Sequence, residues 1–215
     1  MADPLQTGLV LDHLRLLRGP EEMLCVDARI PPGDVLTLMG PSGSGKSTLL
    51  AAITGTLPHA FRCEGRIALN GTPLDGLPPE ARRTGILFQD PLLFPHLSVG
   101  GNLAFGLDPA VKGRAARRAR IDLALSEIGL EGHAPRDPET LSGGQKARVA
   151  LMRVLLSKPR ALLLDEPFSR LDAALRDQVR RLVFDRAKAE GLPVLLVTHD
   201  AADAEAAGGP VISLE

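Results

Sequence analysis

The sequence contains no tryptophan and no tyrosine, and its six phenylalanines are its only aromatic residues. A protein that binds single-stranded nucleic acid by stacking bases needs an aromatic surface, so the composition disfavours this class. The net charge is −1, with 25 Lys and Arg against 26 Asp and Glu, which gives no strong general attraction to nucleic acid. We interpret the one basic cluster, between Arg114 and Arg120, as the solvated face of a helix.

Cysteines and long apolar runs are also scarce. Only Cys25 and Cys63 occur, and neither has a CxxC neighbour, so free thiols in a reducing compartment are the simplest interpretation. The initial segment MADPLQTGLV has neither the basic start nor the apolar core of a secretion signal. No apolar run approaches the roughly 18 residues that a membrane-spanning helix needs. We therefore expect a chain that does not itself cross a membrane.

The segment GPSGSGKST, residues 40–48, follows the apolar segment VLTLM and precedes an apolar helix. It fits the pattern GxxxxGK[ST] in the strand, loop and helix setting that a phosphate-binding loop requires. The glycines let backbone N–H groups surround a phosphate chain. Lys46 would contact the β- and γ-phosphates, and Ser47 would bind Mg²⁺. The nucleotide-binding residues that we predict here are Gly40, Ser42, Gly43, Ser44, Gly45, Lys46, Ser47 and Thr48.

Two adjacent carboxylates, Asp165 and Glu166, stand where the apolar segment ALLLD ends and the residues EP follow. Asp165 is placed to hold a metal ion through its coordination shell. Glu166 could polarise an attacking water as a general base. With the phosphate loop, these acids predict a P-loop NTPase, a class that still includes kinases, GTPases and motor ATPases.

The alternation of segments predicts the fold class. Strand patterns at 9–17, 23–30, 35–40 and 65–71 occupy the first third, and the last of these ends in an Asn-Gly turn that predicts a hairpin. Apolar strands at 161–165 and 193–199 then alternate with helices, which is typical of a parallel sheet. We predict an α/β fold in a single domain, residues 1–215. It has a P-loop core with a parallel sheet, an N-terminal antiparallel β layer and a helical subdomain inserted at about 90–158.

The segment LSGGQ, residues 141–145, predicts a second helix start suited to an anion. Ser142 and Gln145 have the spacing of a capping box, and Gly143 and Gly144 permit close approach to the free N–H groups. A chain that already has a phosphate loop has no obvious use for a second one.

These motifs, together with Gln89 in ILFQD and His199 in VTHD, occur in an order and spacing that resemble those of the ATP-binding-cassette (ABC) ATPases over essentially the full chain. The resemblance implies a homodimer on ATP binding, in which LSGGQ of one copy binds the γ-phosphate of ATP on the other. It also implies roles for single residues: Glu166, His199 and Lys46 in catalysis; Ser47, Gln89 and Asp165 at Mg²⁺; Gln89 at ATP; Ser142, Gly143, Gly144 and Gln145 at the partner's ATP; and Asp172 in the dimer-interface loop.

The segment PLLFPHLSVGGNLAFGL, residues 91–107, resembles the stretch of bacterial importer subunits on which a permease helix docks. Phe94, Leu97 and Leu103 are then partly exposed anchors, or alternatively they fill the core of the insert. The chain is similar to short importer-type subunits and to the ATPases of thiamine, iron, molybdate and sulfate importers. We expect an ATPase coupled to integral-membrane permease subunits and an extracytoplasmic substrate-binding protein, peripheral at the cytoplasmic face of the inner membrane.

Other interpretations remain at this stage. A soluble ABC ATPase of DNA repair or translation would need long insertions or two cassettes, and a small-molecule kinase gives no reason for LSGGQ. ABC ATPases usually stack adenine on an upstream aromatic residue, whereas the matching place here falls near Leu17 or Arg18. A guanidinium or an apolar contact could replace that ring. The transported substrate cannot be read from this chain, because cargo contacts belong to the permease.

Overall fold

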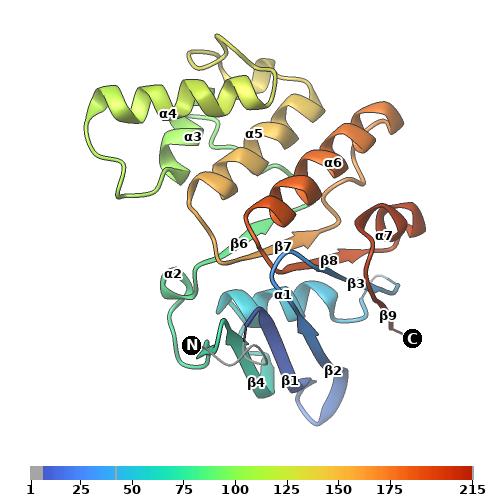
Figure 1. Ribbon diagram of the computed structural model, residues 1–215. Coiled ribbons are helices and arrows are strands. Elements are labelled where there is room, and N and C mark those ends of the chain that lie inside the picture. Colours follow the sequence, from blue (N-terminus) through green and yellow to red (C-terminus); the bar gives the residue numbers. More distant parts are fainter. Residues whose placement is uncertain (1–6, 42, 215) are drawn as a thin grey trace. The chain divides into compact units, whose positions relative to one another are not determined.

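The computed structural model describes residues 7–41 and 43–214 (Figure 1). The chain divides into two compact units. The first comprises the described residues up to Ile86, Arg160–Glu166 and those from Phe184 onward, and the second comprises Leu87–Pro159 and Pro167–Val183.

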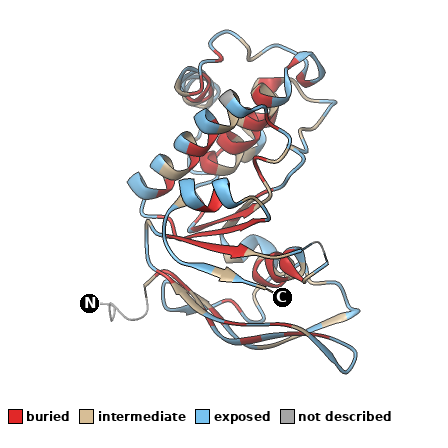
Figure 2. Cartoon of the chain, turned by 90° about the vertical axis from the view of Figure 1, so that its right-hand side faces the viewer, coloured by how far each residue is buried: buried red, intermediate tan, exposed pale blue. Residues whose placement is uncertain are grey.

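A five-stranded sheet has the order β6-β7-β8-β3-β9, and the pairs β7·β8, β8·β3 and β3·β9 are parallel. Every residue of β8 is buried, as are four of the five residues of β3 and of β7, whereas two residues of β9 are exposed (Figure 2). The predicted parallel sheet is therefore confirmed, and its apolar, non-alternating sequence follows from burial on both faces. The strands are β3 (Val35–Met39), β6 (Thr84–Leu87), β7 (Ala161–Asp165), β8 (Val194–Thr198) and β9 (Val211–Ser213).

The predicted antiparallel layer is a four-stranded sheet with the order β2-β1-β4-β5. Asn70 and Gly71 connect its last two strands with φ values of 49° and 77°. Positive φ at both positions is what a two-residue hairpin turn requires, so the predicted hairpin is confirmed. The strands are β1 (Leu9–Arg18), β2 (Glu21–Ile30), β4 (Phe61–Leu69) and β5 (Thr72–Pro73).

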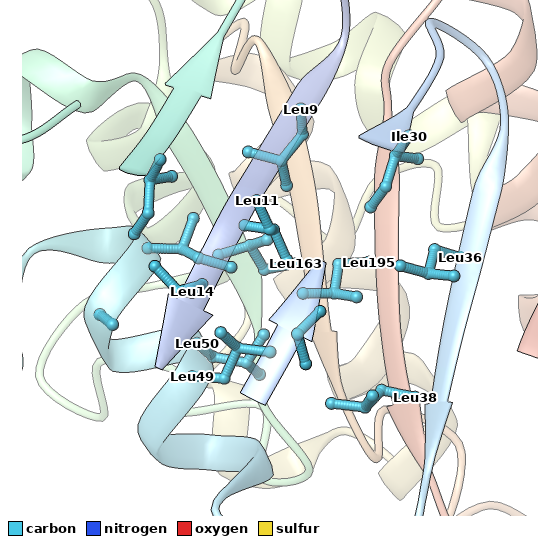
Figure 3. Packing of buried hydrophobic residues seen from close by; sticks show 14 of the residues in the cluster. Leu9, Leu11, Leu14, Ile30, Leu36, Leu38, Leu49, Leu50, Leu163 and Leu195 are labelled. Carbon is cyan, nitrogen blue, oxygen red and sulfur yellow. The ribbon is translucent and has the colours of Figure 1, made fainter. Parts of the chain in front are cut away.

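The helix α1 (Lys46–Thr54) shares one apolar core with both sheets of the first unit (Figure 3). Leu49 and Leu50 of the helix lie in the same cluster as Leu11 of β1 and Leu195 of β8. Burying a leucine side chain contributes about 1.5–3 kcal/mol relative to exposure. This packing holds the beginning of α1 at the end of β3, where the phosphate loop lies.

The second unit is built on the contact between α3 (Val99–Gly106) and α5 (Gly143–Leu156). The helices approach closely because Gly106 has no side chain: a Cβ there would lie 2.1 Å from the carbonyl oxygen of Arg153. The unit also contains α4 (Arg114–Glu127), the short helix η2 (Pro138–Thr140) and the beginning of α6 (Ala173–Ala189).

Three short elements have no counterpart in the sequence prediction. They are α2 (Pro79–Arg82), α7 (Ala201–Ala207) and β9. Two residues of β9 are exposed, so its sequence has no apolar pattern to recognise. The strand is instead held by its backbone pairing with β3. A main-chain bond beside it joins Leu214 N–H to the Met39 carbonyl at 2.7 Å.

Candidate functional site

The phosphate loop connects β3 to α1 and depends on glycine. Gly43 and Gly45 have φ values of 88° and 86°, and Gly45 is the N-cap residue of α1. Side chains other than hydrogen are disfavoured in this left-handed region. Ser42, predicted to bind nucleotide, lies outside the described residues. The loop therefore presents backbone N–H groups and the start of a helix to the same space.

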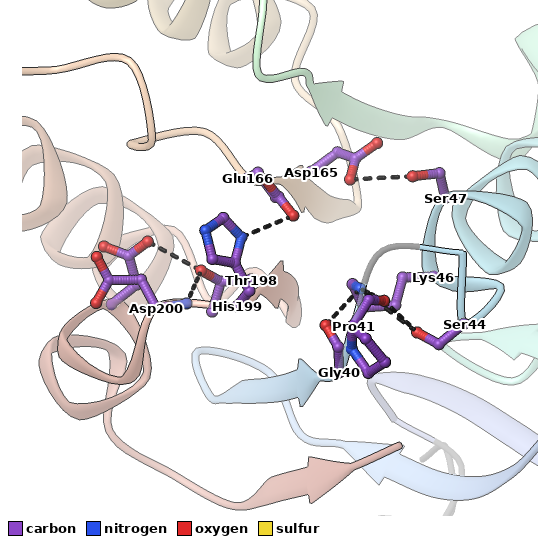
Figure 4. Close-up of polar contacts among 11 residues, drawn as sticks. Gly40, Pro41, Ser44, Lys46, Ser47, Asp165, Glu166, Thr198, His199 and Asp200 are labelled. Atoms are coloured by element: carbon purple, nitrogen blue, oxygen red, sulfur yellow. Dashed lines mark hydrogen bonds and ion pairs between the residues drawn. The ribbon is translucent and has the colours of Figure 1, made fainter. Parts of the chain in front are cut away.

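Lys46 is bound by the carbonyl groups of its own loop. Its side chain is almost fully covered, with the residue 5% exposed, and Nζ donates to the carbonyl oxygens of Gly40 at 2.7 Å and Pro41 at 2.6 Å (Figure 4). A covered ammonium requires such partners, because an unpaired charge in a dry site is costly. A bound phosphate would have to exchange with these carbonyls.

Ser47 and Asp165 meet across the site. The Ser47 hydroxyl donates to Asp165 Oδ1 at 3.3 Å. Burial raises the pKa of the Asp165 carboxyl above its ordinary value, and the Ser47 bond opposes the rise. A hydroxyl and a carboxylate are hard oxygen donors of the kind that Mg²⁺ prefers, so these two residues fit a magnesium site.

Glu166 follows β7 with an unusual backbone. Its φ is 47°, which an ordinary side chain adopts at a cost of roughly 1–2 kcal/mol, and its N–H donates to the Val197 carbonyl at 2.9 Å. In this conformation Oε1 lies 3.0 Å from His199 Nδ1 (Figure 4). The predicted pair of Glu166 and His199 is thus in direct contact, with the glutamate side chain 20% exposed and the histidine 61%.

A buried polar pair that the sequence prediction missed supports the turn that carries His199. The Thr198 hydroxyl donates to Asp203 Oδ2 at 3.0 Å and accepts from the N–H of Asp200 at 3.0 Å. Thr198 and Asp203 are each 1% exposed. Asp200 also caps α7 by accepting from Ala202 N–H at 2.8 Å. The only sequence signal was Asp200 before an alanine-rich stretch, a helix start.

Lys46, Asp165 and Glu166 line one cavity of about 390 Å³ in the first unit. Of the two positions expected near the base, Arg18 lines the cavity, whereas Leu17 is 6% exposed and part of the core. Met23, from the following strand, also lines it and was not predicted. The full lining is Arg18, Met23, Gly43, Gly45, Lys46, Ser47, Thr48, Asp165 and Glu166.

The second unit contains the other predicted residues. Gln89 is exposed just after β6 and lines a cavity of about 320 Å³ with Gly143 and Lys146 of α5 and with Arg170. Arg170 Nη1 lies 3.0 Å from Asp90 Oδ2. The segment after Gln89, the start of α5 and the loop before Asp172 therefore meet at one place.

The start of α5 has the predicted capping box. The Ser142 hydroxyl accepts from Gln145 N–H at 3.3 Å, and the Gln145 side chain accepts from Ser142 N–H at 2.9 Å. The space before Gly143 is open, since a Cβ there would meet nothing within 4 Å. Asp172 Oδ1 accepts from Leu175 N–H at 3.0 Å and so caps α6. The N–H groups of Gly143 and Gly144 precede the first bonds of the helix and are not used by the capping box, which leaves them available to an anion.

Residues 25–169 match the family described as ABC transporter. The chain belongs to this family. The ABC protein YnjD of Escherichia coli, described as an uncharacterized ABC transporter ATP-binding protein, is 54% identical over 192 residues, 88% of each chain. The thiamine import ATP-binding protein ThiQ of Cereibacter sphaeroides is 47% identical over 91% of this chain and 83% of its own. The predicted resemblance to short importer-type ABC subunits, YnjD among them, is confirmed.

A solved ABC structure has the same fold. CbiO1 of Clostridium perfringens, part of the ABC transporter complex cbiONQ, superposes with a TM-score of 0.83 at 30% identity, covering 97% of this chain and 84% of CbiO1. The predicted ABC ATPase fold is confirmed, and the chain is an ATP-binding ABC subunit, a class with ATPase activity. In the described part of the chain, no helix combines the length and apolarity that a bilayer crossing requires.

One prediction about residues 91–107, the segment expected to meet a permease, is corrected by the burial of its side chains. Leu103 is 0% exposed, so its assignment as an exposed anchor is wrong. Val99 and Leu103, four residues apart on α3, are both fully buried, whereas Phe105 lies on the other face and is 69% exposed. Phe94 and Leu97 are half-buried. The exposed large apolar side chains near this segment are Phe88, Leu92 and Phe105.

Proposed function

We propose that this chain is the ATP-hydrolysing subunit of an ABC importer, in which ATP-driven closure of a homodimer is coupled to a separate transmembrane permease. The observation that carries the proposal is the pairing of two anion sites in one chain. One is the phosphate loop with its two acids, and the other is the capped, open start of α5 at Gly143. A symmetric dimer uses both, because each ATP then lies between one copy's loop and the other copy's LSGGQ.

Lys46 and Ser47 receive the triphosphate in this mechanism. The Lys46 ammonium leaves the Gly40 and Pro41 carbonyls for the β- and γ-phosphate oxygens, which accept more strongly because they are charged. Ser47 and Asp165 would hold Mg²⁺, and Gln89 is the further ligand that the family resemblance implies. When bound, the ion supplies positive charge to the phosphates, and it favours the ionised form of Asp165, whose pKa burial raises.

Glu166 takes a proton from the attacking water as the general base. His199 lies close enough for its Nδ1–H to donate to Glu166 Oε1, which keeps the carboxylate oriented. The strained backbone at Glu166 aims the side chain into the cavity that Lys46 and Ser47 also line. Asp172 contacts the partner across the dimer interface.

The relatives support import as the direction of transport. ThiQ is named a thiamine import protein, and PhnT of Salmonella typhimurium, 42% identical over 92% of this chain and 53% of its own, is named a putative 2-aminoethylphosphonate import protein. By analogy, this chain works with integral-membrane permease subunits and an extracytoplasmic substrate-binding protein, peripheral at the cytoplasmic face of the inner membrane. Phe88, Leu92 and Phe105 offer apolar surface to the permease.

Mixing two inactive variants tests the shared site. Lys46→Ala removes the phosphate-loop ammonium, and Ser142→Arg blocks the start of α5, so each homodimer loses both of its sites. A mixed dimer retains one complete site, and random pairing then restores about a quarter of the unaltered ATP turnover. Ser142→Arg protein that is fully active alone, or a mixture that stays inactive, contradicts the proposal.

Glu166→Gln tests the chemistry separately. ATP binding, measured by equilibrium titration, should be unchanged, while turnover should fall by about 10²–10⁴-fold, the usual contribution of a general base. Retained turnover would reject Glu166 as the base. Purification from membranes distinguishes the transport role, because it predicts a co-purifying polytopic membrane protein, whereas a role in DNA repair predicts bound DNA.

A further inference from the structure

The segment that follows Gln89 is attached to α5 by a single side chain. Arg153, in the last turn of that helix, donates from Nη1 to the Leu92 carbonyl at 2.9 Å and from Nη2 to the Pro91 carbonyl at 3.2 Å. Its guanidinium carbon also lies 5.2 Å from the centre of the Phe94 ring. Three contacts thus join residues 91–94 to one planar group, and a planar fork can make all three at once.

The far end of the same segment is held by Asn102. This side chain is 0% exposed, accepts from Phe94 N–H at 2.8 Å, and donates to the carbonyls of Phe94, Leu97 and Ser98 at 3.1–3.3 Å. Asn102 belongs to α3, whose Gly106 touches the backbone of Arg153. Residues 91–98 are therefore fixed at both ends and cannot shift without moving Arg153 or breaking its bonds.

A displacement at Arg153 reaches the other end of α5 because a helix is stiff. The helix runs from Gly143 to Leu156 without proline, so Arg153 lies about 15 Å along it from the LSGGQ end. Burial lowers the pKa of the guanidinium without discharging it. The carbonyls therefore replace lost hydration of the charge, which makes their attachment stronger than that of an exposed arginine.

We propose that Arg153 is the positioning residue that couples the permease-docking segment, residues 91–98, to the LSGGQ end of α5. This inference rests on the proposed function, because it assigns the permease to one end of the connection and the partner's ATP to the other. Arg148 provides a matched control. It lies on the same helix and also donates from Nη1 to a backbone carbonyl, but that carbonyl belongs to Ile128, outside the docking segment.

Hydrogen exchange tests the connection in a Glu166→Gln background, in which ATP binds without being hydrolysed. We compare peptides covering 92–98 and 141–147 with and without ATP, in the otherwise unaltered chain and with Arg153→Met, Arg153→Lys or Arg148→Met. ATP should slow exchange of both peptides. Arg153→Met should leave the ATP effect on 141–147 in place and remove it from 92–98, where exchange rises about tenfold or more. Arg148→Met should preserve both effects.

The outcomes distinguish a failure of the shared ATP site from a failure of the Arg153 connection alone. If ATP fails to protect 141–147 in the background chain, the shared site and the connection built on it both fail. If 141–147 is protected but 92–98 is not, or if Arg153→Met keeps both effects, the coupling role of Arg153 alone is wrong. Should Arg153→Met not fold, Arg153→Lys decides. Lysine keeps the charge but reaches one carbonyl, so the protection of 92–98 should be partly lost, and full protection would overturn the proposal.

Discussion

The two adjacent glycines of LSGGQ have opposite surroundings, although they begin the same helix. A Cβ at Gly143 would meet nothing within 4 Å. A Cβ at Gly144 would lie 1.7 Å from Leu175 Cδ2 and 2.6 Å from its Cγ. Alanine at 143 therefore enters open space, while alanine at 144 must push the Leu175 side chain of α6 out of place.

Comparison of the two variants isolates the cost of that collision. Both substitutions gain the same preference of alanine over glycine in a helix, up to about 1 kcal/mol. Only Gly144→Ala also overfills a packed contact, which typically costs about 1–3 kcal/mol. For a chain of this size, each kcal/mol shifts the unfolding midpoint by about 2–4 °C. Gly144→Ala should therefore unfold measurably below Gly143→Ala, and Gly143→Ala should unfold at or above the unaltered chain.

Calorimetry and ATP turnover together separate an effect of each variant on stability from an effect on phosphate binding. We expect Gly143→Ala to lose turnover without losing stability, because its methyl group occupies the space in which the partner's γ-phosphate would bind. Equal unfolding midpoints for the two variants would show that α6 does not pack on Gly144 as described. A stable Gly143→Ala protein with normal turnover would instead reject phosphate binding at this helix start.

Three further predictions concern single side chains. Asn102→Ala should lower the free energy of unfolding by about 1–3 kcal/mol in urea titrations, because the Phe94 N–H and the Leu97 carbonyl lose the partner that this buried side chain provides; a loss below that of an ordinary surface change contradicts the burial of this side chain. Arg170→Ala should lower the free energy of unfolding by less than about 1 kcal/mol, because the side chains of Arg170 and Asp90 are 60% and 57% exposed. A larger interaction energy between the two residues, measured in a double-mutant cycle with Asp90→Ala, would refute this. Asp165→Asn should stabilise the nucleotide-free chain at neutral pH. Because burial raises the folded pKa of this carboxyl, its ionisation opposes folding. The difference in stability between the variant and the unaltered chain should shrink as pH falls through the raised folded pKa towards the ordinary carboxyl value. A difference that stays constant across that pH range would contradict the raised pKa of Asp165.

The nucleotide site was predictable because its residues follow three strands of one parallel sheet. β3, β7 and β8 are neighbours, so Gly40, Asp165 and His199 all arise at the carboxyl edge. Groups at that edge converge whatever the details of their side chains. The catalytic roles of Glu166 and His199 came from the family resemblance, and the shared edge of the sheet explains why the two side chains meet.

Other features depended on geometry that no local pattern records. The left-handed backbone of Glu166 accompanies its bond to Val197, a residue 31 positions away. Leu103 was proposed as an exposed anchor from the resemblance to importer subunits, with a place in the core as the alternative. An apolar residue in a helical segment can face either way, and the close contact of Gly106 with α5 indicates which face is covered. Met23 had no motif around it and is recognised only by its place in the cavity.

The charges around the cavity favour the proposed second copy of this chain. Among the described lining residues, the cations are Lys46 in the phosphate loop and Arg18 on the strand where the base is expected, and they face the carboxylates of Asp165 and Glu166. A triphosphate carries more negative charge than Lys46 and one divalent ion neutralise, and Glu166 adds to the excess. A further positive group at the γ-phosphate is needed, and the first N–H groups of a helix supply one without a side chain that would occupy the site. The open space before Gly143 on a second copy has that property.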